Sequence, residues 1–295
     1  MTRTLSLLLI AAVSATAFAA ASPVAMDTAG QIYLAAGLRQ QVSASLAAMP
    51  EKLRQMFTAQ TPDKLSAKQV GAVTDAARHA FRIDVFEPSA LAAFAANLDP
   101  EAAAKALAFL SSPTGERMVR ADIALAELDD ATIDEIANGK LGAASTPARA
   151  ALFKKLETVS LATESTATVY LTIARALAVG KAMGYGLDLQ EAEQRVGNAA
   201  PATPPPELER SLEVPLERYI AYDYRDLSGA DLRKMLGFLQ STAGQTYVKA
   251  SIAALSAGFR SMGRRCGERI GESWRELAQN EAQGDVVAAP AAPAP

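Results

Sequence analysis

One segment of this chain occurs twice. Residues 98–125 and 227–254 align without a gap at an offset of 129, and 11 of the 28 aligned positions are identical. Chance would produce about three identities in a chain this rich in Ala. An offset of 129 is too long for the unit of a helical solenoid, so duplication of a whole or half domain fits better. The repeat therefore predicts two related units, at 27–140 and 145–280.

Apolar residues recur at helical spacing along nearly the whole chain, and alternating runs are never longer than about five residues. Helix-start signals are frequent, for example at Ser66, Asp99 and Thr146, the last two followed by Pro. The sequence predicts an all-α fold, interrupted in the second unit by a Pro-rich loop at 197–206. Because Ala-rich helix faces need partners, we expect the two units to pack as one helical body.

The most similar part of the repeat has the motif Phe-Leu-x-Ser-x-x-Gly. In each copy we expect the Ser to end one helix and to N-cap the next. The Gly then falls in the first turn of the second helix, where a missing side chain lets another backbone come close. The first copy also has a Pro at the first position of that helix. These residues, interpreted as structural, are Phe109, Ser112, Pro113 and Gly115 in the first copy, and Phe238, Ser241 and Gly244 in the second.

This motif resembles the signature of an exported bacterial family catalogued as domain of unknown function 2059. Members have a capped helix, a Phe-[Tyr/Leu]-x-Ser-Pro-x-Gly corner and a further helix. Leu107 and Leu236 extend the match, whereas Thr242 replaces the Pro in the second copy. The resemblance covers about 30 residues in each copy. It implies a small helical envelope protein without an assigned activity, so no catalytic or binding residue is carried over.

The N-terminus has the anatomy of a secretory signal peptide. Arg3 precedes an apolar run at 5–12, and an Ala-x-Ala cleavage pattern ends at Ala19. We therefore predict a signal peptide at 1–19, with cleavage possible up to Ala25, and export, most simply to a bacterial periplasm. An uncleaved anchor is the alternative, but the apolar run is short for a bilayer span. No membrane span is expected in the mature chain.

Composition and net charge argue against some classes of binding partner. Loss of Arg3 leaves 28 basic and 32 acidic residues, a net charge of −4, which provides no electrostatic footprint for nucleic acid. Half of the residues are hydrophobic but only 6% are aromatic, a balance that suits closely packed helices with small contact residues. The Ala- and Pro-rich end, residues 283–295, is expected to be a disordered tail.

Two single residues are weak candidates for chemistry. His79, the one His, lies on an Ala-rich helix and is interpreted as structural or partly exposed, with proton transfer or metal binding as the alternative. Cys266, the one Cys, is interpreted as a buried inert thiol. An intermolecular disulfide and an Arg-activated thiol are the alternatives there. No second His or Cys completes a zinc site, and neither a phosphate-loop motif nor a serine elbow occurs, so no metal or cofactor is expected.

Acidic and aromatic clusters receive structural interpretations. The acidic clusters at 129–135 and 191–193 are interpreted as solvated helix faces. The run of Tyr219, Tyr222 and Tyr224 is interpreted as packing rather than as a ligand platform.

The sequence alone favours a non-enzymatic role in the bacterial envelope: binding another envelope protein or a second copy of this chain, or supporting assembly. One alternative is a carrier of an apolar or lipid-like ligand between the two units, which predicts a cavity lined by Leu, Met and Phe. The other is a hydrolase, which predicts His79 or an acidic pair in a deep pocket beside the junction of the repeats.

Overall fold

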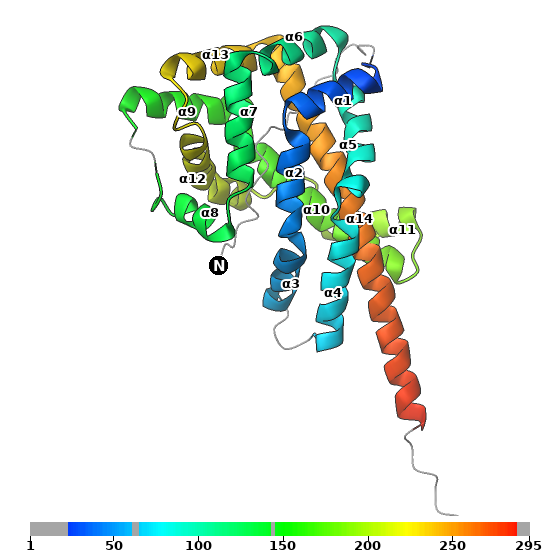
Figure 1. Cartoon of the computed structure of the whole chain (residues 1–295). Coiled ribbons are helices and arrows are strands. Elements are labelled where there is room, and N and C mark those ends of the chain that lie inside the picture. Colours follow the sequence, from blue (N-terminus) through cyan, green and yellow to red (C-terminus); the bar gives the residue numbers. More distant parts are fainter. Residues whose placement is uncertain (1–22, 61–64, 143–144, 288–295) are drawn as a thin grey trace, which may run out of the picture. The chain divides into compact units, whose positions relative to one another are not determined.

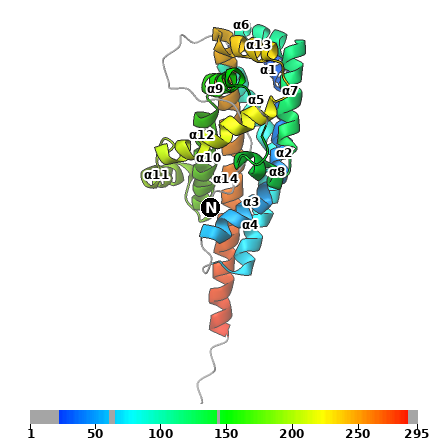
Figure 2. The ribbon, with the colours of Figure 1, turned by 90° about the vertical axis from the view of Figure 1, so that its left-hand side faces the viewer.

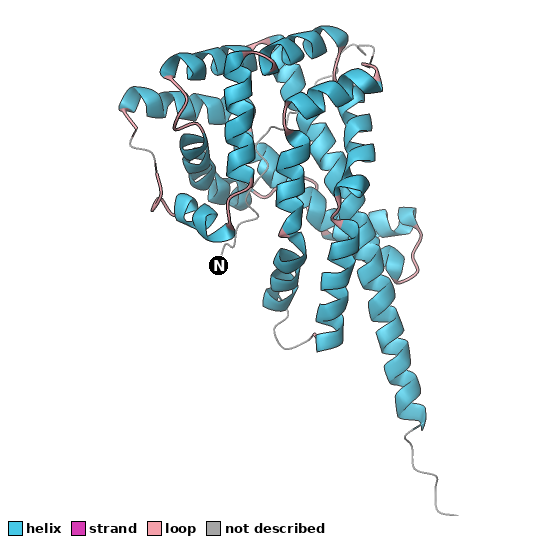
Figure 3. Ribbon diagram, in the orientation of Figure 1, coloured by secondary structure: helices cyan, strands magenta, loops and turns pink. Residues whose placement is uncertain are grey.

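The computed structural model describes residues 23–60, 65–142 and 145–287. Every regular element in this part of the chain is an α-helix, fourteen in all, which confirms the all-α prediction (Figure 3). The predicted signal peptide at 1–19 lies outside the described residues. Of the predicted tail only residues 283–287 are described, and there they extend the last helix.

The described residues form two compact units, whose segments alternate along the chain instead of following one another. Two long helices, α10 and α14, contribute residues to both. Unit 1 contains residues up to 47, 82–172 and 201–261, and unit 2 contains 48–81, 173–200 and 262 onward. The two units predicted from the repeat, at 27–140 and 145–280, are defined by related sequence, whereas the compact units are defined by contacts. The predicted units therefore stay a prediction.

Unit 1 holds most of the helices and both copies of the motif (Figure 1). Its helices are α1 (Met26–Ala35), α2 (Leu38–Ala47), α5 (Ile83–Asn97), α6 (Pro100–Leu110), α7 (Pro113–Ala126), α8 (Asp130–Ala137), α9 (Pro147–Ser160), α12 (Pro206–Asp223), α13 (Gly229–Gln240) and the first parts of α10 (Ala162–Gly184) and α14 (Thr242–Val287).

Unit 2 is built on helix hairpins. Its helices are α3 (Met49–Gln60), α4 (Ala67–Ala80), α11 (Leu189–Ala199) and the remaining parts of α10 and α14. Trp274 of α14 stands edge-on to Phe57, its indole N–H donates to the carbonyl of Gln69 at 3.2 Å, and Lys181 Nζ lies 4.0 Å above its ring. This ring therefore joins α14 to three other helices of the unit.

Side-chain caps decide where several helices begin. The N-caps predicted at Ser66, Asp99 and Thr146 are all present, and Ser66 forms a full capping box with Gln69. The Pro-rich loop separates α11 from α12, which begins at Pro206.

The two motif copies form corners of the same geometry in unit 1. The backbone N–H of Gly115 donates to Ser112 Oγ at 3.1 Å, and that of Gly244 donates to Ser241 Oγ at 3.0 Å. A Cβ atom on Gly115 would lie 2.1 Å from the carbonyl oxygen of Phe109, and one on Gly244 would lie 2.0 Å from the equivalent oxygen of the second copy. Both distances are far inside van der Waals contact, so each corner requires a glycine.

The two corners also touch each other at equivalent positions. The rings of Phe109 and Phe238 are stacked with centroids 4.2 Å apart, and α6 and α13 lie at the same end in both views (Figures 1 and 2). Helix α9 packs on α12 and α13 as α1 packs on α5 and α6. Gly37 after α1 and Leu161 after α9 both have left-handed backbone, with φ of 64° and 53°. These parallels support the duplication that the repeat indicates.

Substitution of either corner glycine should act on stability. We expect Gly115→Val and Gly244→Val each to lower the free energy of unfolding by about 2–3 kcal/mol, because the new side chain meets backbone that belongs to the same tight turn. Thermal unfolding followed by circular dichroism measures this loss. Unchanged melting of both variants would contradict the structural role of these glycines.

In unit 2, glycines bring α10 and α14 into backbone contact. A Cβ atom on Gly180 would lie 1.9 Å from the carbonyl oxygen of Arg264, and one on Gly267 would lie 2.1 Å from that of Leu177. Gly184 and Gly271 meet the facing backbone in the same way. Glycines four residues apart lie on one side of a helix, so together they form a flat strip against which the other helix packs.

Candidate functional site

Two aspartates meet inside unit 1. Asp223 is the last residue of α12, where Tyr224 ends the helix and a short turn leads to Ser228, the N-cap of α13. Asp122 lies on α7. The side chains of Asp122 and Asp223 share a hydrogen bond, and the hydroxyl of Tyr224 donates to Asp122 Oδ1 at 2.8 Å. Two carboxyl groups, one from each of the two units predicted from the repeat, are thus held together.

Both carboxyl groups of this pair have raised pKa values. Burial, and then the neighbouring charge of Asp122, hold the pKa of Asp223 well above its usual range. Burial also raises the pKa of Asp122 to about 6, against the lowering effect of hydrogen bonds from Tyr224 and Asp223. The end of α12 acts in the same direction, because the negative end of a helix dipole disfavours a carboxylate. Because two buried carboxylates in contact repel each other, the favoured state of the pair has one shared proton and one negative charge.

One oxygen atom of this pair lacks a hydrogen-bond partner among the described residues. Asp223 is 6% exposed, and its Oδ1 atom has no hydrogen-bond partner among the residues that the structure describes. Leaving a buried acceptor unsatisfied costs about 1–3 kcal/mol. Such a group is retained in a fold when a bound water, an ion or a ligand satisfies it.

A nearby carboxylate shows the contrast. Asp231, also buried, accepts hydrogen bonds from Thr114 Oγ1 at 2.8 Å, from Ser228 Oγ at 2.7 Å and from Arg117. These hydrogen bonds, that of Ser228 foremost, hold its pKa well below the usual range. Asp231 is therefore a satisfied structural link between α7 and α13, whereas Asp223 is not.

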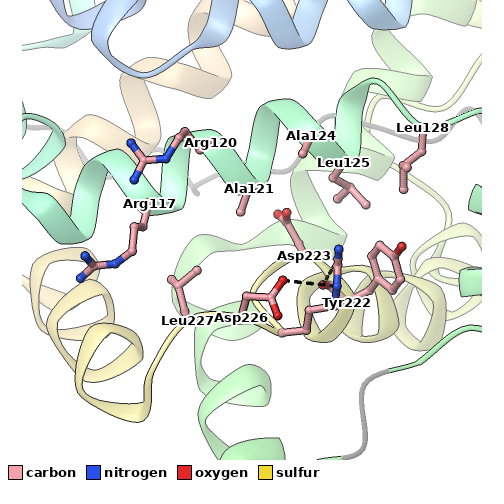
Figure 4. A pocket seen from close by; sticks show the side chains of 11 residues that line it. Arg117, Arg120, Ala121, Ala124, Leu125, Leu128, Tyr222, Asp223, Asp226 and Leu227 are labelled. Atoms are coloured by element: carbon pink, nitrogen blue, oxygen red, sulfur yellow. Dashed lines mark hydrogen bonds and ion pairs between the residues drawn. The ribbon is translucent and has the colours of Figure 1, made fainter.

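A pocket of about 270 Å³ lies against Asp223 (Figure 4). Its walls come from α7 and from the turn that joins α12 to α13, and the carboxyl group of Asp223 points across it toward α7. The α7 wall is mainly apolar, while the turn contributes most of the polar groups. The lining residues are Arg117, Arg120, Ala121, Ala124, Leu125, Leu128, Tyr222, Asp223, Arg225, Asp226 and Leu227.

Arg225 is the basic side chain that acts on Asp223. Its guanidinium group lies 4.0 Å from the ring centre of Tyr222, and its positive charge partly offsets the raised pKa of Asp223. Its ion pair with Asp226 is long, at 3.6 Å. Arg117 is instead engaged by Asp231. Arg225 therefore keeps donor capacity at the pocket.

The single-residue candidates of the sequence lie elsewhere. His79 is exposed on α4, with Nδ1 2.8 Å from the carbonyl oxygen of Asp75, and it belongs to unit 2. Cys266 is fully buried, and burial raises the pKa of its thiol to about 12, which matches the interpretation as an inert thiol.

The tyrosine run has a larger part than packing alone. Tyr219 and Tyr224 are buried, as expected, but Tyr224 also holds Asp122, and Tyr222 lines the pocket. Sequence reasoning missed Asp122 and Asp223, which lie 101 positions apart and carry no local motif. The signal available was the aspartate at 223, set in an apolar stretch directly before Tyr224.

Two further properties of the described residues bear on function. Within 23–60, 65–142 and 145–287, no group of three or more His, Cys, Asp or Glu side chains is placed to hold a metal ion. None of the helices described there is both long and apolar enough to cross a bilayer.

No protein-family model, curated protein or solved structure matches this chain. Membership of the family of domain of unknown function 2059, implied by the corner motif, therefore stays a prediction.

Proposed function

We propose that this protein is a non-enzymatic binding protein, and that the pocket at Asp223 takes a small ligand bearing an amine. The observation that carries this proposal is the buried Oδ1 atom of Asp223, an acceptor without a donor among the described residues, on a side chain that faces the pocket. The carboxyl pair has one negative charge, so an ammonium group satisfies both its hydrogen-bonding and its charge. This is a form of the carrier role that the sequence left open, with a polar anchor in place of a wholly apolar cavity.

The fold itself does not demand a carboxyl pair at this place. At the offset of the repeat, Asp223 corresponds to Phe94 and Asp122 corresponds to Ser251. Phe94 is fully buried and packs edge-on against Tyr247, and Ser251 donates to the backbone of its own helix. The related position is thus filled without an ionisable group. A buried carboxyl pair is costly, and it is present at only one of the two related positions. Its presence there supports a binding role.

A second candidate is the hydrolase, because two carboxyl groups that share a proton are also the arrangement of aspartic acid–base dyads. In such a dyad both carboxyl groups contact the attacking water. Asp223 lines the pocket, whereas Asp122 is not among its lining residues and is held by Tyr224. This geometry favours binding over hydrolysis.

Calorimetric titration with isopentylamine tests the proposal, with isopentanol as the uncharged counterpart. We expect the wild-type protein to bind the amine with a Kd on the order of 0.1–1 mM at pH 7.5, and the alcohol far more weakly. Asp223→Asn should weaken amine binding at least tenfold, since the negative charge that the pair shares can then no longer reside on the carboxyl group that lines the pocket.

Asp75→Asn is the matched control, because Asp75 is an exposed residue of α4. It should leave amine binding unchanged. Equal affinity of the wild-type protein and Asp223→Asn for the amine, or no binding by the wild-type protein, would overturn the proposal.

We further propose that the protein acts in the bacterial envelope, after removal of its signal peptide. The side chain of Val24 is buried and its N–H donates to the carbonyl of Leu98 at 3.2 Å, which supports cleavage at Ala19 or Ala21 over Ala25. Binding to another envelope protein, or to a second copy of this chain, stays a prediction from the sequence.

A further inference from the structure

We infer that the ligand of this pocket is a free amino acid with an apolar side chain, whose ammonium group meets Asp223 and whose carboxylate meets Arg225. The inference rests on the proposed function and names the class of ligand for the same site. It follows from three features of the pocket: an unsatisfied acceptor, a nearby cation and an apolar wall.

The first two features lie close together on the turn after α12. Arg225 and Asp223 are two residues apart, and the charge of Arg225 acts on the Asp223 carboxyl group. Arg225 Nη1 donates to the carbonyl of Tyr222 at 2.7 Å, which places the guanidinium group beside the pocket. Nε forms the long ion pair with Asp226, and Nη2 keeps its donors for a ligand. A guanidinium group binds a carboxylate with two parallel hydrogen bonds. A ligand that has both an ammonium group and a carboxylate matches these two opposite charges better than a simple amine does.

The third feature is the wall that α7 provides. Ala121, Ala124, Leu125 and Leu128 all line the pocket from that helix and the residues just after it. Burying a Leu-sized side chain against such a wall contributes about 1.5–3 kcal/mol of hydrophobic free energy.

The volume of the pocket suits a small ligand. Pockets for drug-sized molecules measure about 300–1,000 Å³, whereas this one measures about 270 Å³. A single amino acid fits within this volume.

Three probes separate the parts of the ligand: L-leucine, isopentylamine, which lacks the carboxylate, and isocaproate, which lacks the amine. Each is titrated by calorimetry into the wild-type protein, Asp223→Asn and Arg225→Gln. We expect leucine to bind at least tenfold more tightly than either single-charge probe.

Arg225→Gln separates recognition of the carboxylate from a general loss of structure. It should weaken leucine binding at least tenfold but leave isopentylamine binding unchanged or stronger, because it removes a cation beside the ammonium group. A damaged pocket would weaken both.

Three results would overturn the inference. If isopentylamine binds as tightly as leucine, the inference of an amino-acid ligand is wrong, while the proposed amine-binding function stands. If neither binds, both are wrong. Leucine binding that survives in Arg225→Gln would also exclude the assigned role of Arg225.

Discussion

Gly180→Ala should unfold at a temperature roughly 10 °C below the wild-type protein. The new Cβ atom would lie 1.9 Å from the carbonyl oxygen of Arg264 and 2.8 Å from the backbone nitrogen of Glu268. Backbone cannot rotate away as a side chain does, so α10 and α14 must separate along their contact within unit 2. We expect a loss of about 3 kcal/mol or more. Thermal unfolding by circular dichroism measures it.

Gly71→Ala is the matched control, since Gly71 lies in α4 of the same unit and a Cβ atom there would have no neighbour within 4 Å. There Ala should stabilise the protein by about 0.5–1 kcal/mol, because it favours helix over the unfolded chain. The same chemical change is thus expected to have opposite signs at two helical glycines. A loss of similar size at both positions would contradict the backbone contact.

Asp223→Asn should make the protein more stable than wild type at pH 8 and leave it nearly unchanged at pH 4.5. A carboxyl group whose pKa is raised in the folded state binds a proton more tightly there than in the unfolded chain. Its contribution to stability is therefore full below the unfolded pKa, about 3.9, and is lost as the pH rises through the raised value. Asp122, whose folded pKa is about 6, acts in the same direction.

The expected gain at pH 8 is on the order of 2 kcal/mol. The side-chain amide of the variant keeps a donor for Asp122 at every pH, whereas the acid must hold its proton against the bulk solution. The groups that act on the pair are the hydroxyls of Tyr224 and Tyr247 and the cation of Arg225, and all remain in the variant.

Melting curves at both pH values, for the wild-type protein, Asp223→Asn and Asp75→Asn, provide the measurement. A gain for Asp223→Asn that is the same at pH 4.5 and pH 8 would show that the carboxyl pair does not share a proton.

The sequence predicted local features of this fold well and the contact between distant helices poorly. Helical periodicity and the caps at Ser66, Asp99 and Thr146 depend on neighbours a few residues away, so they are visible in the chain alone. The contact of α10 with α14 depends on glycines about 85 residues apart. Their spacing of four is present in the sequence, at Gly180 and Gly184 and again from Gly263, but spacing alone does not say which helix faces which.

The candidate site was hidden for a related reason. An isolated Asp on a helix is most often a solvated residue, and the one local sign to the contrary was the position of Asp223 directly before Tyr224. Their pairing arises only when the turn after α12 meets α7. His79 and Cys266 were candidates because each is the one residue of its type in the sequence. That a residue type occurs once does not indicate where the residue lies in the fold. Tyr224 was a better guide, since a buried hydroxyl needs a polar partner.

The stacking of Phe109 on Phe238 bears on the duplication that the repeat predicts. The subunits of a symmetric dimer also touch each other at equivalent residues. In such a dimer every substitution appears twice, so the cost of a buried carboxyl pair is incurred at two places. Duplication within one chain instead lets each related segment change alone. The presence of Phe94 and Ser251 at the positions that correspond to Asp223 and Asp122 is in keeping with such independent change.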